Sequence, residues 1–488
     1  MFKFILKAAG IAVVALIVVG GALYLLGLRV ILDGGGTPTL RFVQSTDAQA
    51  DLIAKHREAQ KASDPPPAPP AAPAPPSPSD TGTPESPITP AEAVKLPVPS
   101  IAVSRYWTDF RGPDRSGHYR EMPIRTDWPA TGLKPVWKQP IGAGYASFVI
   151  ANGQAFTIEQ RGAQEVVAAY DVATGRELWT NAWNAAFREM MGGDGPRATP
   201  TWHDGRVYAL GGAGELRALD AATGRVLWRT NILTDAGATN LQWGMSAAPL
   251  IVDEAVVVLP GGPNGNSVVA YDRTTGTRAW SALDDTASYA SPMLVTLGGV
   301  RQILVFSASR LVSLAADSHA VLWEFPWTTQ YGVNASQPLL LGNDRLFVST
   351  GYGSGAAAIQ LTKEGDRFSV SELWRTNRMK NQFTSSLLHE GFIYGLDESI
   401  LACMDAATGA LIWKGGRYGY GQVMLASGHL VILSESGDLA LVRATPEKHV
   451  ELAVFPVLEG KTWNHPAMSG GYLLVRNLNE MAAFDLRR

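Results

Sequence analysis

One eleven-residue pattern, Ala-x-Asp-x-x-Thr-Gly-x-x-x-Trp, recurs along this chain of 488 residues and constrains its fold more than any other feature. Units of about 40–50 residues that hold about four short strands are typical of β-propeller blades. The pattern therefore predicts an all-β, eight-bladed propeller of four-stranded blades. The aromatic residues that end the repeats, 39 to 52 positions apart, are Trp137, Trp179, Trp228, Trp280, Trp323, Trp374, Trp413 and Phe455.

Each letter of the pattern has its own structural role. The Asp accepts hydrogen bonds from turn N–H groups, and the Gly takes a positive φ in the hairpin. The Trp packs on the neighbouring blade, and a small residue such as Cys403 leaves room for its ring. We interpret the motif residues as docking residues between blades, not as cofactor ligands: Asp171, Gly175, Trp179, Asp220, Gly224, Trp228, Asp272, Gly276, Trp280, Trp323, Trp374, Asp405, Gly409 and Trp413.

The eighth repeat begins at Ala483-Phe484-Asp485 and lacks its outer strand, because the sequence stops at Arg488. An unassigned strand, Lys134–Lys138, precedes the first full repeat. We expect that strand to complete the last blade, since this closure leaves no open sheet edge.

The first 32 residues carry a membrane signal. The run Ala8–Leu28 has no charge, and a helix of this length spans the hydrocarbon core of a bilayer. Lys3 and Lys7 precede it, so the positive-inside rule places the N-terminus in the cytoplasm. Residues 1–32 are therefore predicted to be a single-pass inner-membrane anchor, with the propeller in the periplasm. A cleaved signal peptide is the alternative.

Two segments separate this anchor from the repeats. In the juxtamembrane segment 33–63, Asp47–Ala62 is expected to form a polar helix with Asp47 as its N-cap and its charges in solvent. Residues 64–104 are predicted to be a disordered Pro-rich linker, with 12 prolines between Asp64 and Pro90. The propeller is assigned to residues 105–488.

Composition narrows the function. The formal net charge is −3, which gives no indication of a nucleic-acid partner. The single Cys excludes an internal disulfide and a Cys-rich zinc site, and the eight His show no metal-binding spacing. No catalytic residue or metal ligand is identified.

The repeats resemble those of pyrroloquinoline-quinone (PQQ) propellers, over residues 105 to 488. This family includes the eight-bladed quinoprotein alcohol dehydrogenases and the BamB-type propellers of outer-membrane protein assembly, which are not enzymes. The segment Trp107–Pro113 looks like the lead-in of PQQ-like proteins without assigned chemistry. The resemblance implies the fold and leaves two activities open.

The dehydrogenase branch implies PQQ with Ca²⁺, an acidic base, and a cofactor stacked between a Trp and a ring made by two adjacent bonded Cys. One Cys cannot make that ring. Trp243 is the one weak candidate for a cofactor contact, and PQQ with Ca²⁺ stays possible through the resemblance alone.

Loops that join one blade to the next gather at one face of a propeller, and here they are rich in aromatic and basic residues, which are enriched at binding hot spots. This face predicts a protein partner in the cell envelope. The alternatives are a PQQ-dependent dehydrogenase acting on alcohols or sugars and a module that binds a small ligand or polysaccharide. The candidate residues are Trp183, Arg188, Asp194, Arg197, Trp243, Trp327, Tyr331, Arg378, Lys380, Arg417, Tyr418 and Trp463.

Overall fold

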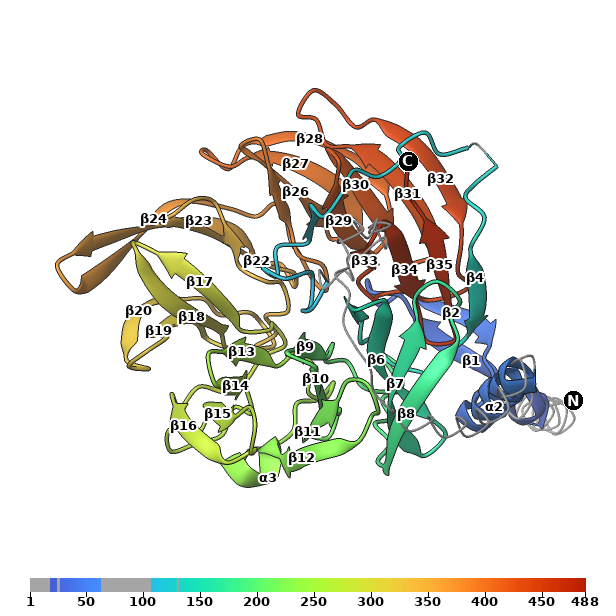
Figure 1. The fold of residues 1–488 in the computed structure, drawn as a ribbon. Helices are drawn as coiled ribbons and strands as arrows, with labels where there is room; N and C mark the ends of the chain where they lie inside the picture. The colour runs from blue at the N-terminus through green and yellow to red at the C-terminus, as the bar shows by residue number, and fades with distance from the viewer. Residues whose placement is uncertain (1–17, 24–26, 63–106, 130) are drawn as a thin grey trace, which may run out of the picture.

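A computed structural model describes residues 18–23, 27–62, 107–129 and 131–488. Eight antiparallel sheets stand around a central axis, as Figure 1 shows. The innermost strands of neighbouring blades contact one another, while the outermost strands form the rim. The prediction of an all-β, eight-bladed propeller with four-stranded blades is confirmed.

The first four blades follow one another along the chain. Blade 1 is β5 (Val149–Ala151), β6 (Gln154–Arg161), β7 (Gln164–Asp171) and β8 (Glu177–Asn184). Blade 2 is β9 (Thr201–His203), β10 (Arg206–Leu210), β11 (Glu215–Asp220) and β12 (Val226–Asn231), followed by the short helix α3 (Ile232–Ala236). Blade 3 is β13 (Leu250–Val252), β14 (Ala255–Val258), β15 (Val268–Asp272) and β16 (Arg278–Ala282). Blade 4 is β17 (Met293–Leu297), β18 (Val300–Phe306), β19 (Arg310–Ala315) and β20 (Val321–Pro326).

The remaining four blades complete the ring. Blade 5 is β21 (Leu339–Leu340), β22 (Arg345–Thr350), β23 (Gly355–Glu364) and β24 (Arg367–Thr376). Strands β23 and β24 form a long hairpin that projects from the rim. Blade 6 is β25 (Leu387–His389), β26 (Phe392–Asp397), β27 (Ile400–Asp405) and β28 (Leu411–Arg417). Blade 7 is β29 (Gln422–Ala426), β30 (His429–Leu433), β31 (Asp438–Arg443) and β32 (Glu451–Pro456), with β3 (His118–Tyr119) added beside β29. Blade 8 is β33 (Ala467–Ser469), β34 (Tyr472–Arg476), β35 (Glu480–Asp485) and β4 (Trp137–Pro140).

The ring closes as the sequence predicts. Strand β4 pairs antiparallel with β35, and Trp137 lies opposite Ala483. An N-terminal strand therefore supplies the outer edge of the last blade, and no blade is left with three strands.

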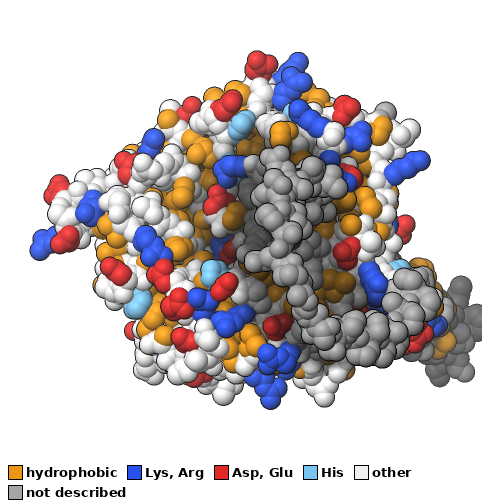
Figure 2. Space-filling model, in the orientation of Figure 1, with side chains coloured by type: hydrophobic (Ala, Val, Ile, Leu, Met, Phe, Trp, Pro, Cys, Tyr) orange, Lys and Arg blue, Asp and Glu red, His pale blue; other side chains and the backbone are white. Residues whose placement is uncertain are grey.

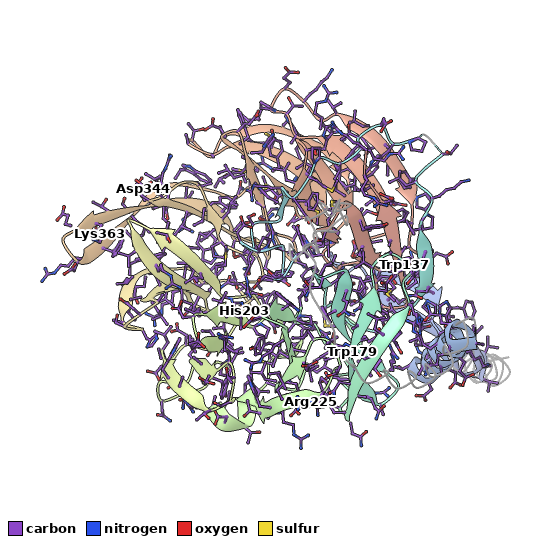
Figure 3. All side chains as sticks on the ribbon, viewed as in Figure 1. Trp137, Trp179, His203, Arg225, Asp344 and Lys363 are labelled. Atoms are coloured by element: carbon purple, nitrogen blue, oxygen red, sulfur yellow. The ribbon has the colours of Figure 1, made fainter. Side chains whose placement is uncertain are left out.

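The Trp of one blade rests on the hairpin turn of the next. The ring of Trp179 lies against Gly224, where a Cβ atom would come within 2.4 Å of it, and its Nε1 donates to the carbonyl oxygen of Ala221 at 2.9 Å. Trp137, Trp228 and Trp374 repeat this contact on the Gly of the following blade. Figure 3 shows Trp137 and Trp179 on the outer strands of blades 8 and 1.

The remaining docking Trp residues contact other partners: Trp280 and Trp413 reach the following blade, whereas Trp323 bonds within its own blade. Trp280 stacks on His319, with ring centroids 4.1 Å apart, because blade 4 has no Gly there. Trp323 donates to Oε1 of Gln302 at 2.7 Å, and Trp413 donates to the carbonyl oxygen of Thr445 at 3.0 Å. Cys403 is completely buried, in agreement with its predicted role as a small residue.

The N-terminal segment packs against the propeller. It forms the hairpin β1 (Leu28–Leu32) and β2 (Pro38–Phe42), followed by α2 (Thr46–Ala62), beside blades 8 and 1 (Figure 1). The predicted polar helix is present, but the prediction that Asp47 caps it is wrong. The cap is Ser45, whose Oγ accepts a hydrogen bond from the N–H of Ala48 at 3.1 Å.

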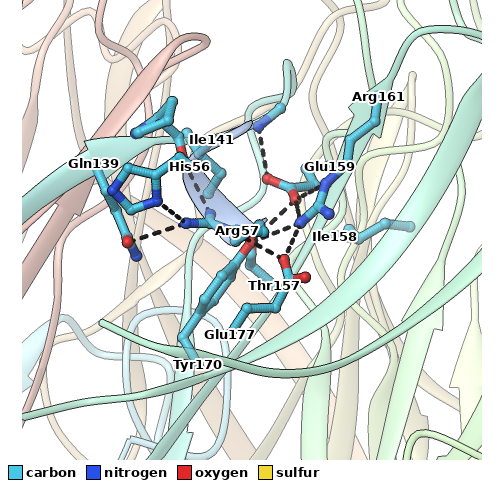
Figure 4. A network of polar contacts seen from close by, with 12 residues as sticks. His56, Arg57, Gln139, Ile141, Thr157, Ile158, Glu159, Arg161, Tyr170 and Glu177 are labelled. Carbon is cyan, nitrogen blue, oxygen red and sulfur yellow. Dashed lines mark hydrogen bonds and ion pairs between the residues drawn. The ribbon is translucent and has the colours of Figure 1, made fainter. Parts of the chain in front are cut away.

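The expectation that the charges of this helix lie in solvent is also wrong for Arg57, which is 5% exposed. Its guanidinium pairs with Glu177 at 3.2 Å and donates to Gln139 at 3.0 Å (Figure 4). Glu177 in turn pairs with Arg161, which also pairs with Glu159. Burial alone would raise the pKa of Glu159, but Arg161 and neighbouring guanidiniums hold it below its ordinary value. This network ties α2 to blades 8 and 1.

Most of the predicted anchor, Ala8–Leu28, and the linker 64–104 lie outside the described residues. Leu28 begins strand β1 and is not helical. Within the part of the chain that is described, no helix combines the length and the apolar character needed to cross a membrane.

Candidate functional site

The two faces of the propeller carry different loops. One face carries the loops between blades and the loops between the second and third strands of each blade; we call its centre the mouth. The other face carries the turns between the first and second strands. On the face drawn in Figure 2, acidic and basic side chains are interspersed, in keeping with the small net charge.

The face opposite the mouth is closed by residues 107–119, which we call the plug. The plug contacts the inner strands one after another: Trp107 bridges to β5, the carbonyl oxygen of Thr108 accepts from β9, and β3 pairs with β29. Figure 1 shows this part of the chain in cyan near the centre of the ring, and it ends beside the inner strand β29. The plug therefore links the inner strands of several blades on this face.

Two arginines of the plug are buried in the channel. Arg115, 3% exposed, pairs with Asp109 at 3.1 Å and donates to the carbonyl oxygens of Pro249 at 2.5 Å and Pro292 at 2.7 Å. Arg111, 2% exposed, donates to the carbonyl oxygen of Ser386 at 3.3 Å, and burial lowers its pKa to about 9. These contacts are structural, and no sequence pattern predicts charged groups at the axis.

Aromatic side chains gather at the mouth. Trp463 lies 5.2 Å from Tyr145 and 4.5 Å from Phe383, and Phe383 lies 5.9 Å from Tyr420, between ring centroids. On the other side of the mouth, Trp243 pairs with Tyr289 at 5.6 Å and Tyr331 with Tyr352 at 5.6 Å. The mouth thus offers half-buried rings from blades on both sides of the axis.

Charged groups stand among these rings. One carboxylate oxygen of Glu435 accepts from Nε1 of Trp463 at 2.9 Å, and the other accepts from the N–H of Tyr420 at 3.1 Å. The Lys461 ammonium lies 4.2 Å from the Trp463 ring centroid, and burial lowers its pKa to about 8. Such mixed aromatic and charged surfaces are typical of protein-binding sites.

The β1–β2 hairpin covers part of the mouth. A groove of about 1810 Å³ separates it from the loops of blades 6, 7, 8 and 1. Arg188, Asp194, Arg417 and Tyr418 line this groove, together with Glu435 and Lys461. Trp243, Tyr331 and Arg378 do not line it.

Three residues predicted for the binding face are buried, which corrects the expectation that they are available to a partner, and of these Tyr418 alone lines the groove. Trp183, 9% exposed, lies between blades 1 and 2 under the Arg217 guanidinium. Trp327, 3% exposed, donates to Oγ1 of Thr350 at 2.9 Å, and Tyr418, 4% exposed, donates to Glu451 at 2.6 Å.

The other predicted residues divide by exposure. Arg188, Arg378 and Arg417 are exposed, although Arg417 ends strand β28 and is not in a turn as expected. Tyr331 is 63% exposed. Lys380 is half-buried and pairs with Glu398 at 2.9 Å.

Arg197 and Asp194 organise their own loop. The Arg197 guanidinium lies over Phe187 at 4.6 Å and donates to the carbonyl oxygen of Gly193 at 2.7 Å, and Asp194 accepts from the N–H of Glu189 at 3.3 Å. Sequence reasoning missed Tyr145, Glu435 and Lys461. Lys461 could have been predicted, because it lies in the loop after blade 7, two residues before the predicted Trp463.

The described residues do not fit the Ca²⁺ and quinone site that the dehydrogenase resemblance implies. Among the residues that the structure describes, no three His, Cys, Asp or Glu side chains lie close enough together to share a metal ion. Glu189 and Glu435, two of the carboxylates that line the groove, already accept hydrogen bonds from the protein. Trp243 packs against Tyr289 and brings no such ligand with it.

A family model described as outer membrane protein assembly factor BamB matches residues 163–415, slightly more than half of the chain. The chain belongs to this family. Similar proteins include the outer membrane protein assembly factor BamB of Burkholderia pseudomallei, 21% identical over 301 residues, which are 60% of this chain and 71% of the relative. The BamB of Bordetella pertussis is 22% identical over 367 residues, 67% of this chain and 91% of the relative.

The dehydrogenase branch of the fold is also similar. The 1-butanol dehydrogenase (cytochrome c) of Thauera butanivorans is 25% identical over 191 residues, 38% of this chain and 27% of that enzyme.

Among solved structures, BamB from Moraxella catarrhalis has a TM-score of 0.50 at 14% identity, covering 72% of this chain and 97% of that chain. A europium-containing methanol dehydrogenase has a TM-score of 0.60 at 12% identity, covering 78% and 98%. Identities this low show the propeller fold alone.

Proposed function

We propose that this protein is a non-catalytic scaffold of the cell envelope that binds a protein partner at its mouth during outer-membrane protein assembly. The observation that carries the proposal is the mouth itself, where half-buried rings and charged groups lie beside a groove of about 1810 Å³. Membership of the BamB family supports the assembly role. The uncharged run Ala8–Leu28 supports a tether in the inner membrane that holds the propeller in the periplasm.

The dehydrogenase remains a second candidate because solved dehydrogenases share the fold. It is the weaker one, since the ligand set for Ca²⁺ is not assembled among the described residues. Stoichiometric PQQ binding, lost on a Trp243→Ala change, would favour it.

The partner role is tested in cells and then at the mouth. Deleting the gene should lower the amount of folded β-barrel proteins in the outer membrane, and wild-type protein should restore it. A photo-crosslinking residue at Tyr331 should join the full-length protein to a component of the assembly machinery. Unchanged β-barrel levels, with no crosslink, would contradict the proposal.

Charge reversal separates the mouth from the rim. Arg378→Glu with Arg417→Glu should slow association with the crosslinked partner, and the loss should shrink at high salt, because exposed charges steer encounter. Lys363→Glu is the matched control, since Lys363 lies on the projecting hairpin of blade 5 (Figure 3). Equal effects of both changes would argue against recognition at the mouth.

A further inference from the structure

The tip of the β1–β2 hairpin is held in the mouth through its main chain. The N–H of Gly34 donates to Oε1 of Glu435 at 2.7 Å, and its carbonyl oxygen accepts from Nε2 of Gln382 at 2.9 Å. Nζ of Lys461 donates to the carbonyl oxygen of Leu32 at 3.5 Å. Glu435, Gln382 and Lys461 come from three different loops, and each bonds a main-chain atom of the hairpin rather than a side chain.

The mouth also selects glycine at one position. A Cβ atom on Gly34 would lie 2.3 Å from the ring of Tyr420, closer than any side chain tolerates. At the next residue, Gly35, a Cβ atom would meet the Tyr420 hydroxyl and Asp33 at 3.4 Å, which is an ordinary contact. The turn itself is closed internally, since the N–H of Gly36 donates to the carbonyl oxygen of Asp33 at 3.0 Å.

The hairpin is weakly attached outside its tip. All five residues of β2 are exposed, and Leu40 and Phe42 are 68% and 67% exposed. Glu435 keeps two other donors, Trp463 and the N–H of Tyr420, so its carboxylate is not stranded when Gly34 leaves. Elements with few buried contacts open at low free-energy cost.

We propose that the mouth is a binding site for a glycine-containing peptide turn, that residues 32–36 occupy it in cis, and that a turn of the protein partner replaces them. This rests on the proposed function in one respect, the existence of a partner that competes for the mouth. The hairpin then acts as a tethered competitor, whose local concentration sets how tightly a partner must bind.

Opening is tested in the full-length protein by a matched pair of variants. In Gly34→Ala the added methyl group meets the Tyr420 ring, so hydrogen exchange of peptides spanning residues 28–42 and 416–421 should accelerate about ten-fold or more. Gly35→Ala should exchange like wild type. Equal exchange in all three proteins would overturn the cis occupancy, and equal acceleration in both variants would show general loosening instead.

Exchange in trans is tested with a synthetic peptide of residues 28–42. Labelled with fluorescein, it should bind the full-length Gly34→Ala protein about ten-fold or more tightly than wild type, whose mouth is already filled. The same peptide carrying Gly34→Ala should not bind. Equal binding of both peptides, or equal binding to both proteins, would overturn the proposal.

A second copy of this chain is the rival occupant. If the wild-type hairpin enters the mouth of a neighbouring molecule, the wild-type protein is dimeric on size exclusion and Gly34→Ala is monomeric, and that outcome overturns replacement by a partner's turn. The peptide experiment contains no envelope protein, so its failure is separate from failure of the proposed function, which the crosslink from Tyr331 reports.

Discussion

Segments of the same chain lie over the two ends of the central channel, and they are held there in opposite ways. The plug buries the guanidiniums of Arg111 and Arg115 against carbonyl oxygens at the start of several inner strands. The hairpin tip makes a few part-buried hydrogen bonds through Gly34 and Leu32 and leaves β2 exposed. A charged group that is buried against acceptors from several strands belongs to the fold, whereas a cover held by a few main-chain bonds can leave without unfolding it.

The largest effect should come from the plug charge. Arg115→Met removes the partner of the half-buried Asp109 and of three carbonyl oxygens, those of Ala248, Pro249 and Pro292. Breaking one side of a buried pair typically costs about 3–5 kcal/mol, so the free energy of unfolding in urea should fall by that amount. Arg120→Met, which breaks an exposed pair with Asp114, is the control and should change stability little. A comparable loss in both would show that the plug is not part of the core.

A matched pair of glycines tests the comparison directly. A Cβ atom on Gly117 in the plug would come within 2.6 Å of Nη2 of Arg111 and 2.8 Å of Leu387, at a φ of +77°. Gly117→Ala should therefore lower the free energy of unfolding by about 2–3 kcal/mol. Gly34→Ala creates an equally close contact, yet it should leave the thermal midpoint almost unchanged, because the hairpin can lift away. A large global loss in Gly34→Ala would make the hairpin part of the fold.

Acid should weaken the plug end selectively. His465 packs under Trp107 and Phe110, and burial, together with the neighbouring Arg111, lowers its pKa to about 3. The unfolded chain binds this proton near pH 6.5, so its contribution to stability is complete above that value and is lost as pH falls toward 3. Between pH 7 and pH 5 the loss is about 2 kcal/mol.

This loss is measured as a difference between variants. The stability gap between wild type and His465→Gln should shrink by about 2 kcal/mol from pH 7 to pH 5. The subtraction cancels other titrating groups, including Glu165, whose pKa burial raises to about 7 and which acts in the opposite sense. His429→Gln, at a half-buried site at the start of β30, is the control variant. A gap that is constant with pH would mean that His465 titrates normally.

The blade architecture could be predicted from the sequence because each repeat has the same spacing and the same contact residues. The spacing of the motif determines the blade count, and the missing strand after Asp485 predicts where Trp137 must pair. The contact between Trp179 and Gly224 recurs between other pairs of blades, so the structure of one repeat predicts that of the others.

The mouth was only partly readable, because it is built from positions outside the repeat. Loop membership predicted Trp463 and Arg417 but could not tell an exposed ring from a buried one, and Trp327 and Tyr418 turned inward to bond Thr350 and Glu451. The contacts of the plug and the hairpin could not be predicted, since no pattern near Arg115 or Gly34 indicates which distant loops these segments contact. Long-range pairing of unique segments leaves no periodic signal.

The smallest expected effect concerns α2, which lies between the two extremes. Arg57 is buried like the plug arginines, yet its partner Glu177 also pairs with Arg161, so removing Arg57 leaves no unpaired carboxylate. Arg57→Met should therefore lower the global free energy of unfolding by about 1 kcal/mol or less, while hydrogen exchange across residues 46–62 accelerates about ten-fold or more, because bonds to a charged group are lost from that helix alone. Lys55→Met, on the exposed side of the same helix, should leave exchange unchanged. If Arg57→Met destabilised the whole protein as much as Arg115→Met, the N-terminal segment would have to be counted with the plug, and a hairpin attached to it through residues 43–45 would no longer be free to leave the mouth.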